Sequence, residues 1–479
     1  MATTSSITKT KTTTMTLNPA FPLSKQHTHT HTLLVKLLIT FLLSGLALRL
    51  ILSNNSISIT TKIEQHHHHH PPLDNLFGSV QTEQGFLDNL KPNFTHPTND
   101  SNEAPLKKTG DYQEKSNHTS QKNGLAECDI FVGKWVRDPT GPIYTNQTCH
   151  FIEPPQNCMR NGRPDSDYLY WKWSPRDCEL PTFDAARFLD LMTNKSWAFI
   201  GDSISRNHVQ SLLCILSQVE EVTEVYHDDE YKSKRWHFPA HNFTLSVIWS
   251  PYLVKADVFE DNDGHSSAET QLYLDKIDPK WSQEYTNFDY IIFAGGKWFL
   301  KTAIYYENNT IIGCHYCPKR NLTELGYDFA YRKAIRLVLN YMSNSGHKPK
   351  ILFRTTTPDH FENGEWFSGG TCNRTVPFNE GEVGFKDVDS IMIKVELEEH
   401  ERAYNIALRN GIELKLLDNS KASLLRPDGH PGPYRFFQPY ANGGGSGNGD
   451  GKLINDCLHW CLPGPIDYWN DLIMYALSH

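Results

Sequence analysis

The chain has 479 residues, a formal net charge of −9 at pH 7 and a pI near 6.2. This acidic balance lacks the basic footprint that is typical of nucleic-acid-binding proteins, so no nucleic-acid partner is expected. Length alone allows roughly three domains. Aromatic residues make up 12% of the sequence, which predicts a well-packed core with surplus tryptophan and tyrosine rings able to stack on carbohydrate.

The N-terminal quarter is predicted to contain a membrane anchor and a flexible stem. Residues 1–32 contain no acidic residue and are expected to be a disordered cytosolic tail. Residues 33–52 are an apolar run with Lys36 and Arg49 near its ends; a run of this length spans roughly 30 Å of bilayer. Lysines before it favour a cytosolic N-terminus. We therefore expect a single-pass type II signal anchor, followed by a flexible luminal stem over residues 53–126.

Cysteine usage indicates an oxidising compartment. All ten cysteines lie between Cys128 and Cys461, and N-x-S/T sequons recur along the chain; together they favour a glycosylating lumen. Cys314 and Cys317 have the two-residue gap of a zinc knuckle. Because no second Cys-x-x-Cys completes such a site, we expect a local disulfide or two separate bridges, and no metal.

Residues 127–479 are predicted to fold as one α/β domain. Ligand sites in such folds lie at the carboxyl edge of the sheet, where Gly295-Gly296 and Thr355–Pro358 each follow a strand. Strands that alternate with helices predict a mostly parallel sheet that is covered on both faces. In chain order, the patterns predict a helix at 183–192, a strand at 197–200, a helix at 206–218, strands at 243–249 and 290–294, a helix at 327–342, a strand at 351–354, a helix at 391–410, a strand at 412–417 and a closing helix at 469–477.

Ser203 is the first candidate for chemistry. It follows Gly201 and Asp202 where a buried strand turns into a helix, so its hydroxyl would lie beside backbone N–H groups and a positive helix end. Such a hydroxyl can act as a nucleophile whose oxyanion those groups stabilise. The alternative is that Ser203 only caps the helix.

Two carboxylate–imidazole pairs compete to activate it. Asp456 and His459 are three residues apart, so one helical turn would place both on one face, and disulfides from Cys457 and Cys461 could fix that loop. Asp428 and His430 form the rival pair, although their proline and glycine neighbours favour a plain turn with Asp428 bonded to its own backbone. The first pair is favoured. Two other histidines, His208 and His360, are expected to be structural or surface groups.

Several blocks together resemble the trichome birefringence-like proteins of plants. They are the opening Cys128-Asp-Ile-Phe-Val-Gly-Lys-Trp135, Trp171-Lys-Trp173, the Gly-Asp-Ser block and Asp456-Cys-Leu-His459, in family order. The resemblance implies a PC-esterase domain with an SGNH/GDSL-like three-layer sandwich over about residues 127–479, in the Golgi membrane with its catalytic domain luminal. It also implies disulfides Cys128–Cys178 and Cys149–Cys214, with Cys158 and Cys372 bonded to the Cys457/Cys461 pair.

The same resemblance implies O-acetylation of cell-wall polysaccharide, with Ser203 as nucleophile, His459 as base and Asp456 as its orienting carboxylate. Blocks such as Gly313–Cys317 look most like the altered-xyloglucan subgroup, which favours galactose on xyloglucan as acceptor, ahead of xylan and mannan. No bound cofactor is expected, but an acetyl donor derived from acetyl-CoA is required. The alternatives are a polysaccharide acetylesterase and a non-catalytic wall-polysaccharide binder. Lys297 stands where the family pattern has histidine, which leaves a cleft contact there in doubt. Residues expected around the oxyanion and substrate are Gly201, Asp202, Arg206, Asn207 and Gly296.

Overall fold

The computed structural model describes residues 129–259, 268–441 and 453–479. The predicted tail, anchor and stem, residues 1–126, lie outside these ranges, as does Cys128. Within the described ranges, no helix is both long enough and apolar enough to cross a membrane.

A seven-stranded sheet organises the described part of the chain, in the order β13-β12-β9-β3-β6-β5-β4. Its five strands from β13 to β6 pair in parallel, whereas β5 pairs antiparallel with both β6 and β4. The predicted α/β class and parallel sheet are therefore confirmed, with an antiparallel hairpin added at one edge. The strands are β3 (Ser196–Gly201), β4 (Thr223–His227), β5 (Lys234–Phe238), β6 (Phe243–Trp249), β9 (Tyr290–Phe293), β12 (Lys350–Arg354) and β13 (Leu414–Leu417).

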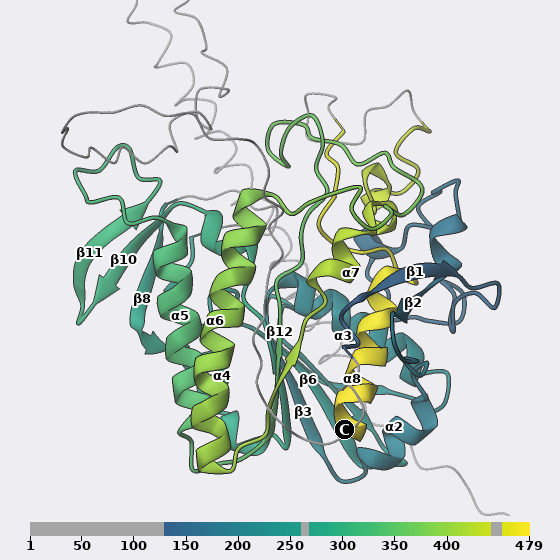
Figure 1. The fold of residues 1–479 in the computed structure, drawn as a ribbon, viewed down its shortest axis with the longest axis horizontal. Coiled ribbons are helices and arrows are strands. Elements are labelled where there is room, and N and C mark those ends of the chain that lie inside the picture. The colour runs from purple at the N-terminus through teal and green to yellow at the C-terminus, as the bar shows by residue number, and fades with distance from the viewer. Residues whose placement is uncertain (1–128, 260–267, 442–452) are drawn as a thin grey trace, which may run out of the picture. The chain divides into compact units, whose positions relative to one another are not determined.

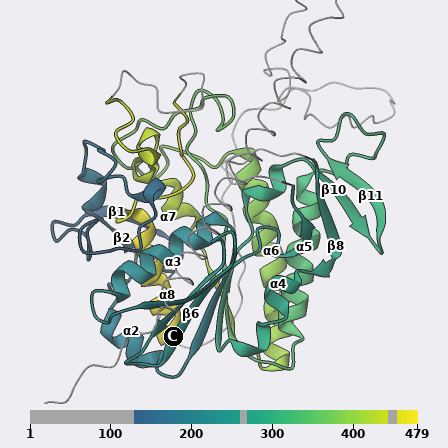
Figure 2. The same ribbon diagram turned by 180° about the vertical axis from the view of Figure 1, so that it is seen from behind.

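Helices cover both faces of this sheet and make three layers (Figures 1 and 2). Side chains alternate across a strand, so Trp197 and Phe199 of β3 pack with α2, α3 and α8, while Ala198 and Ile200 pack with α5 and α6. Burial of all four explains why β3 reads as a continuous apolar run. The helices are α2 (Ala185–Leu191), α3 (Ser203–Leu216), α4 (Pro279–Ser282), α5 (Tyr327–Ser343), α6 (Asp387–Asn410), α7 (Ser420–Leu424) and α8 (Tyr468–Ser478).

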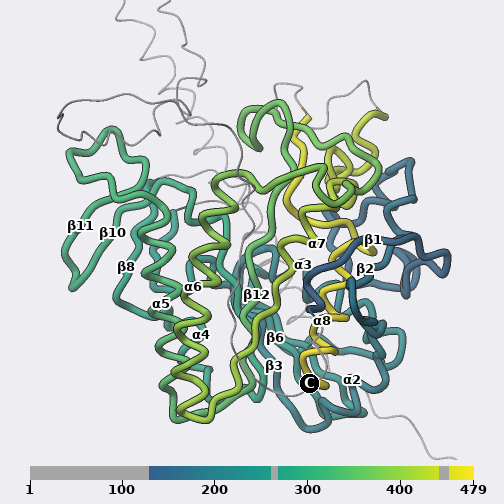
Figure 3. Tube along the Cα trace, in the orientation of Figure 1, coloured from purple at the N-terminus to yellow at the C-terminus, as the bar shows by residue number. Residues whose placement is uncertain are grey.

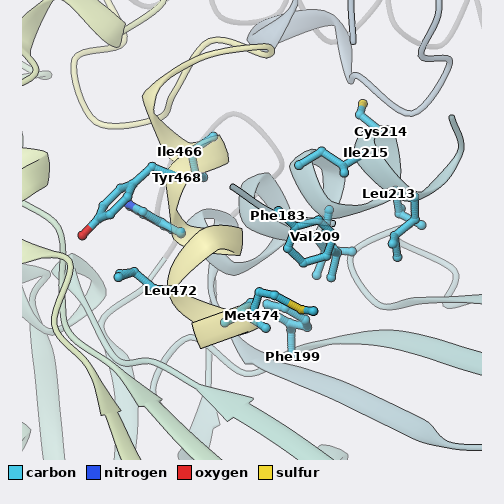
Figure 4. Close-up of a cluster of buried hydrophobic side chains, with 14 of the residues drawn as sticks. Phe183, Phe199, Val209, Leu213, Cys214, Ile215, Ile466, Tyr468, Leu472 and Met474 are labelled. Carbon is cyan, nitrogen blue, oxygen red and sulfur yellow. The ribbon is translucent and has the colours of Figure 1, made fainter. Parts of the chain in front are cut away.

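The core beneath α3 joins the consecutive elements β3 and α3 to the distant C-terminal helix α8 (Figure 4). Phe199 of β3 lies with Val209 and Leu213 of α3 and with Leu472 and Met474 of α8, and all five are buried. Full burial of such side chains contributes about 1.5–3 kcal/mol each. The position of α3, and of Ser203 at its start, is therefore fixed by the C-terminal helix as well as by the sheet.

Two smaller β units were not predicted. One is the antiparallel β1–β2 pair, and the other is the mixed four-stranded sheet β11-β10-β8-β7, in which β10 pairs parallel with β8 and the other pairs are antiparallel. The prediction missed these short strands because several are half exposed and lack a strong apolar run. Their bounds are β1 (Gly133–Arg137), β2 (Trp171–Pro175), β7 (Val254–Asp257), β8 (Thr270–Ile277), β10 (Ala303–Glu307) and β11 (Thr310–His315).

Four disulfides lie in the described ranges, and their pairing matches the expected one. They are Cys149–Cys214, Cys158–Cys461, Cys314–Cys317 and Cys372–Cys457. The expected partner of Cys178 is outside the described residues. Figure 3 shows that the loops of the C-terminal third, coloured green to yellow, gather at one end of the sheet, where two of these bridges hold them.

Candidate active site

Ser203 is the first residue of α3, but it does not cap the helix. The N-cap is Asp202, whose carboxylate accepts a hydrogen bond from the Ile204 N–H at 3.0 Å. The capping role that the alternative interpretation gave to Ser203 therefore belongs to Asp202. The helix begins three residues earlier than predicted, and the partly exposed Ser203 hydroxyl takes no part in the cap. Ser203, two residues after the end of β3, therefore lies at the carboxyl edge of the sheet.

Two glycines let the ends of β3 and β9 approach each other at this edge. A Cβ on Gly201 would lie 2.5 Å from the Ser205 hydroxyl and 2.8 Å from the Ala294 carbonyl oxygen. A Cβ on Gly296 would lie 2.8 Å from the Asp202 carboxylate. All three distances are too short for a side chain, so the loop after β9 lies directly against the Gly-Asp-Ser turn.

The predicted Asp456–His459 pair is formed. The His459 Nδ1 lies 2.9 Å from Asp456 Oδ2 and 3.2 Å from Oδ1. Burial alone would raise the pKa of Asp456, but the charge of His459 and its hydrogen bonds hold that pKa well below the usual range. An ionised Asp456 accepts a hydrogen bond from Nδ1–H, which fixes the tautomer in which Nε2 can act as a base. His459 keeps a side chain that is 21% exposed.

The backbone that carries this pair is a loop and not the helical turn that the spacing predicted. Asp456 pairs with Gly432 in an isolated bridge, and its Oδ1 also accepts from the backbone N–H groups of Leu458 and His459, at 3.2 and 2.9 Å. An aspartate that bonds to the backbone two and three residues later stabilises a turn of this kind in place of a helix. One carboxylate therefore shapes the loop and orients the imidazole.

Asn207 ties this loop to the helix of Ser203. Its Oδ1 accepts from the Trp460 N–H at 2.7 Å, and its Nδ2 donates to the Trp460 carbonyl at 3.2 Å. Asn207 is fully buried and lies one helical turn after Ser203, on the same face. Its amide is therefore engaged in positioning the residue after His459.

The charge of His459 acts on Asp202, the residue before Ser203. Burial raises the pKa of Asp202, and the charges of Arg354 and His459 oppose that rise. In the described residues, no hydrogen bond joins the Ser203 hydroxyl to the His459 ring. Such catalytic bonds often form only when substrate is bound.

Disulfides fix the base-bearing loop on both sides. Cys457 is bonded to Cys372, and Cys461 is bonded to Cys158. The backbone of the next residue, Leu462, donates to the Gln156 carbonyl at 2.9 Å. The predicted role of the two loop cysteines is therefore supported by their geometry.

The rival pair does not form. Asp428 makes a bidentate ion pair with buried Arg426, at 2.8 and 3.0 Å, and not the predicted bond to its own backbone. His430 instead contacts the His459 carbonyl oxygen and the ring of His360, both at 2.7 Å. Burial lowers the pKa of His430 to about 3 and that of His360 to about 4. His430 therefore contacts the backbone of the loop that carries His459, and His360 contacts His430. His208 is likewise buried in the core.

Lys297 points into an ion-pair cluster and not into open solvent. Its ammonium group bonds to Asp389 and lies 3.1 Å from Asp359, and the side chain is 13% exposed. Burial disfavours its charge, but the two carboxylates outweigh that effect and raise the pKa of Lys297. Lys297 thus braces the loop of Gly296 against α6.

A buried network behind the turn was missed by the sequence analysis. Glu396 of α6 accepts from the Thr356 N–H with both oxygens, at 2.9 and 3.0 Å, and from the Tyr331 hydroxyl. Arg354 is buried nearby, and its charge acts on both Asp202 and Glu396. The only signal in the sequence was a glutamate on the apolar face of a helix.

Among described residues, the one group with the composition of a metal site is Cys314, Cys317 and Glu324. The two sulfur atoms are joined in a disulfide, and the thiolate is the form that binds metals. The group therefore offers no pair of thiolate ligands in this state.

Comparisons with known proteins agree with this geometry. Residues 180–476 match PC-Esterase, described as a GDSL/SGNH-like acyl-esterase family found in Pmr5 and Cas1p, and residues 126–179 match the PMR5 N-terminal domain. Protein trichome birefringence-like 25 of Arabidopsis thaliana is 51% identical over 91% of each chain. Protein trichome birefringence-like 26 of the same plant is 58% identical over 73% of this chain and 77% of its own. Xyloglucan O-acetyltransferase 1 of Arabidopsis thaliana is 45% identical over 73% of this chain and 80% of its own. The chain belongs to the PC-esterase family and, within it, groups with the plant trichome birefringence-like proteins.

Proposed function

We propose that this protein is a polysaccharide O-acetyltransferase that acts through an acetyl-serine on Ser203. The observation that carries the proposal is the buried Asn207–Trp460 pair, which holds the Asp456–His459 pair against the helix that begins at Ser203. A nucleophile at a strand–helix turn and a base oriented by a carboxylate are the parts that acyl transfer requires.

The reaction is a double displacement. His459 Nε2 takes the Ser203 proton as the serine oxygen attacks the acetyl carbonyl, and the leaving group of the donor departs with that proton. His459 next takes the proton of a sugar hydroxyl, whose oxygen attacks the acetyl-serine; Ser203 leaves and regains a proton. Backbone N–H groups at Ser203 and Gly296 are the proposed oxyanion donors. The Thr356 N–H is not proposed as a further oxyanion donor, because it already donates to Glu396.

The proposed acceptor is galactose on xyloglucan side chains, and the proposed donor is derived from acetyl-CoA. Support for the acceptor comes from the relatives named xyloglucan O-acetyltransferase, at 42–45% identity. The sequon and cysteine pattern and the apolar run at 33–52 support the proposed place in the Golgi membrane, with the catalytic domain luminal.

The test is product analysis with the purified full-length protein. It is incubated with an activated acetyl ester and unacetylated xyloglucan oligosaccharide, and products are resolved by mass spectrometry. Acetylated oligosaccharide supports the proposal. Release of acetate from acetylated xyloglucan without transfer would instead indicate an esterase, and binding without turnover would indicate a wall-polysaccharide binder.

Ser203→Ala should abolish transfer. The matched control is Ser217→Ala, because Ser217 lies at the other end of α3 and bonds only within that helix end. Transfer that survives in Ser203→Ala would remove the proposed nucleophile.

A further inference from the structure

A pocket of about 260 Å³ opens next to the helix of Ser203. Its walls are the segment 150–154, the first turns of α3 and strands β4 to β6. The side chains that carry the argument are Glu153, Arg206, Gln210, Glu224, Lys234 and Trp236.

The pocket is built from the same parts as the catalytic site. Arg206 lies three residues after Ser203 on α3, so the two side chains are neighbours on the helix surface. Gln210, one turn further on, accepts from the Glu153 N–H at 3.0 Å. The segment of Glu153 continues to Cys158, which is bonded to Cys461 on the loop of His459. The position of a ligand in this pocket is therefore fixed relative to Ser203 and His459.

Two hydrogen-bond donors of the pocket have no partner. The Arg206 Nε and the Trp236 Nε1 are buried, and neither makes a hydrogen bond within the described residues. Trp236 is only 5% exposed, and the Arg206 guanidinium is held 5.1 Å from the centre of the Trp249 ring. Buried donors without acceptors are costly, and native proteins rarely leave them so. The side chains that carry both donors line the pocket.

The charges of the pocket balance. Lys234 lies 3.9 Å from both Glu153 and Glu224, at distances longer than a direct hydrogen bond. With Arg206, two cations face two carboxylates, so the pocket offers donors and acceptors without a net charge. This pattern suits a neutral polyhydroxylated ring and disfavours an anion. The volume is smaller than the roughly 300–1,000 Å³ of pockets for drug-sized ligands, which suits a single sugar ring.

We propose that this pocket binds one neutral pyranose residue of the acceptor polysaccharide, next to the residue that receives the acetyl group. Hydroxyl oxygens of that ring accept hydrogen bonds from Arg206 Nε and Trp236 Nε1. The proposal rests on the proposed function. Arg206 lies one helical turn from Ser203, and it belongs to an acceptor site only if Ser203 is the nucleophile.

Binding is measured by calorimetry in the Ser203→Ala background, where turnover does not interfere, with unacetylated xyloglucan oligosaccharide as the probe. Arg206→Lys keeps the charge but removes Nε–H, and Trp236→Phe removes Nε1–H. Each should weaken binding by about tenfold, the usual effect of losing one charge-assisted or buried hydrogen bond. The matched control is Arg235→Lys, since Arg235 points to the opposite face of β5 and pairs with Glu284.

Unchanged affinity in Arg206→Lys would overturn the proposal, as would tighter binding of an oligogalacturonide of equal length. Arg206→Lys decides alone if Trp236→Phe fails to fold by circular dichroism. The outcomes separate the two proposals. If wild-type protein transfers acetyl groups while these variants bind normally, only the subsite is wrong. If the variants lose binding while wild-type protein shows no transfer, the pocket binds the sugar but the proposed function, and with it the role as an acceptor subsite, is wrong.

Discussion

The Asn207 amide is joined to the backbone of Trp460 by two hydrogen bonds across 253 positions of the chain, at 2.7 and 3.2 Å. This contact fixes the loop of His459 to the helix of Ser203, and both partners are buried. It gives the proposed nucleophile and base a common rigid support, which is what efficient acyl transfer requires.

Replacing Asn207 should therefore impair both activity and stability. Asn207→Leu leaves the Trp460 N–H and carbonyl without partners, at a cost of about 1–3 kcal/mol for each group, and releases the His459 loop. We expect kcat to fall by roughly 100-fold, since small misplacements of catalytic groups cost about that much, with a lower melting temperature. Asn410→Leu is the control: Asn410 bonds to the Ser343 carbonyl at the far end of α6 and should lose stability while kcat is retained. Equal kcat values for the two variants would contradict the assigned role of Asn207.

Asp456→Asn should lower kcat by roughly 10³–10⁴-fold while the fold is retained, because an amide no longer selects the tautomer in which Nε2 is free. Asp428→Asn should instead act on stability. It leaves the charge of buried Arg426 without its carboxylate, which costs about 3–5 kcal/mol. Steady-state kinetics and thermal melts of both variants separate the two pairs. A larger loss of kcat in folded Asp428→Asn would favour the rival pair.

The Cys372–Cys457 bridge should matter more than Cys314–Cys317. The first closes 85 residues of chain beside Asp456, and the second closes 3. Removing a cross-link of the longer kind costs about 4 kcal/mol in the chain-entropy account. We expect the double alanine variant of Cys372 and Cys457 to lose both stability and transfer activity. The double variant of Cys314 and Cys317, measured in parallel by calorimetry and activity assay, should keep its activity.

Glu396 predicts a pH dependence of stability. Burial raises its pKa to about 8, despite hydrogen bonds from Tyr331 and Thr356. Between its ordinary pKa of 4.5 and about 8, the folded state holds a proton that the unfolded state has lost, so stability falls as pH rises through this window. The contribution is about 1.4 kcal/mol per pH unit.

Glu396→Gln should reduce the slope by about 1.4 kcal/mol per pH unit, because a neutral amide replaces a neutral carboxyl. Buried Asp471, whose pKa burial also raises to about 8, keeps its own contribution. Glu398→Gln, on the same helix but with a side chain that is 46% exposed, should leave the slope unchanged. Urea unfolding from pH 5 to 8 measures both. An unchanged slope in Glu396→Gln would show that another group binds the proton.

The buried strand β3, helix α3 and the Asp456–His459 pair could be predicted from the sequence because each depends on local pattern. Strand β4 could not, since all five of its residues are exposed and carry no apolar alternation. The bond between Asn207 and Trp460 could not be predicted either, because nothing in a helix sequence reveals a partner 253 positions away. The helical turn expected at Asp456 gave way to a loop, because the carboxylate bonds to the backbone of Leu458 and His459.

The most direct test of the account is to trap the acetyl-enzyme. Full-length protein is mixed with an activated acetyl ester without acceptor, quenched in acid, digested and sequenced by mass spectrometry, before and after a chase with xyloglucan oligosaccharide. The account predicts one acetyl group on Ser203, absent in His459→Ala and lost to the oligosaccharide during the chase. Transfer to the oligosaccharide with Ser203 unmodified throughout, or with the acetyl group carried by another residue, would contradict it.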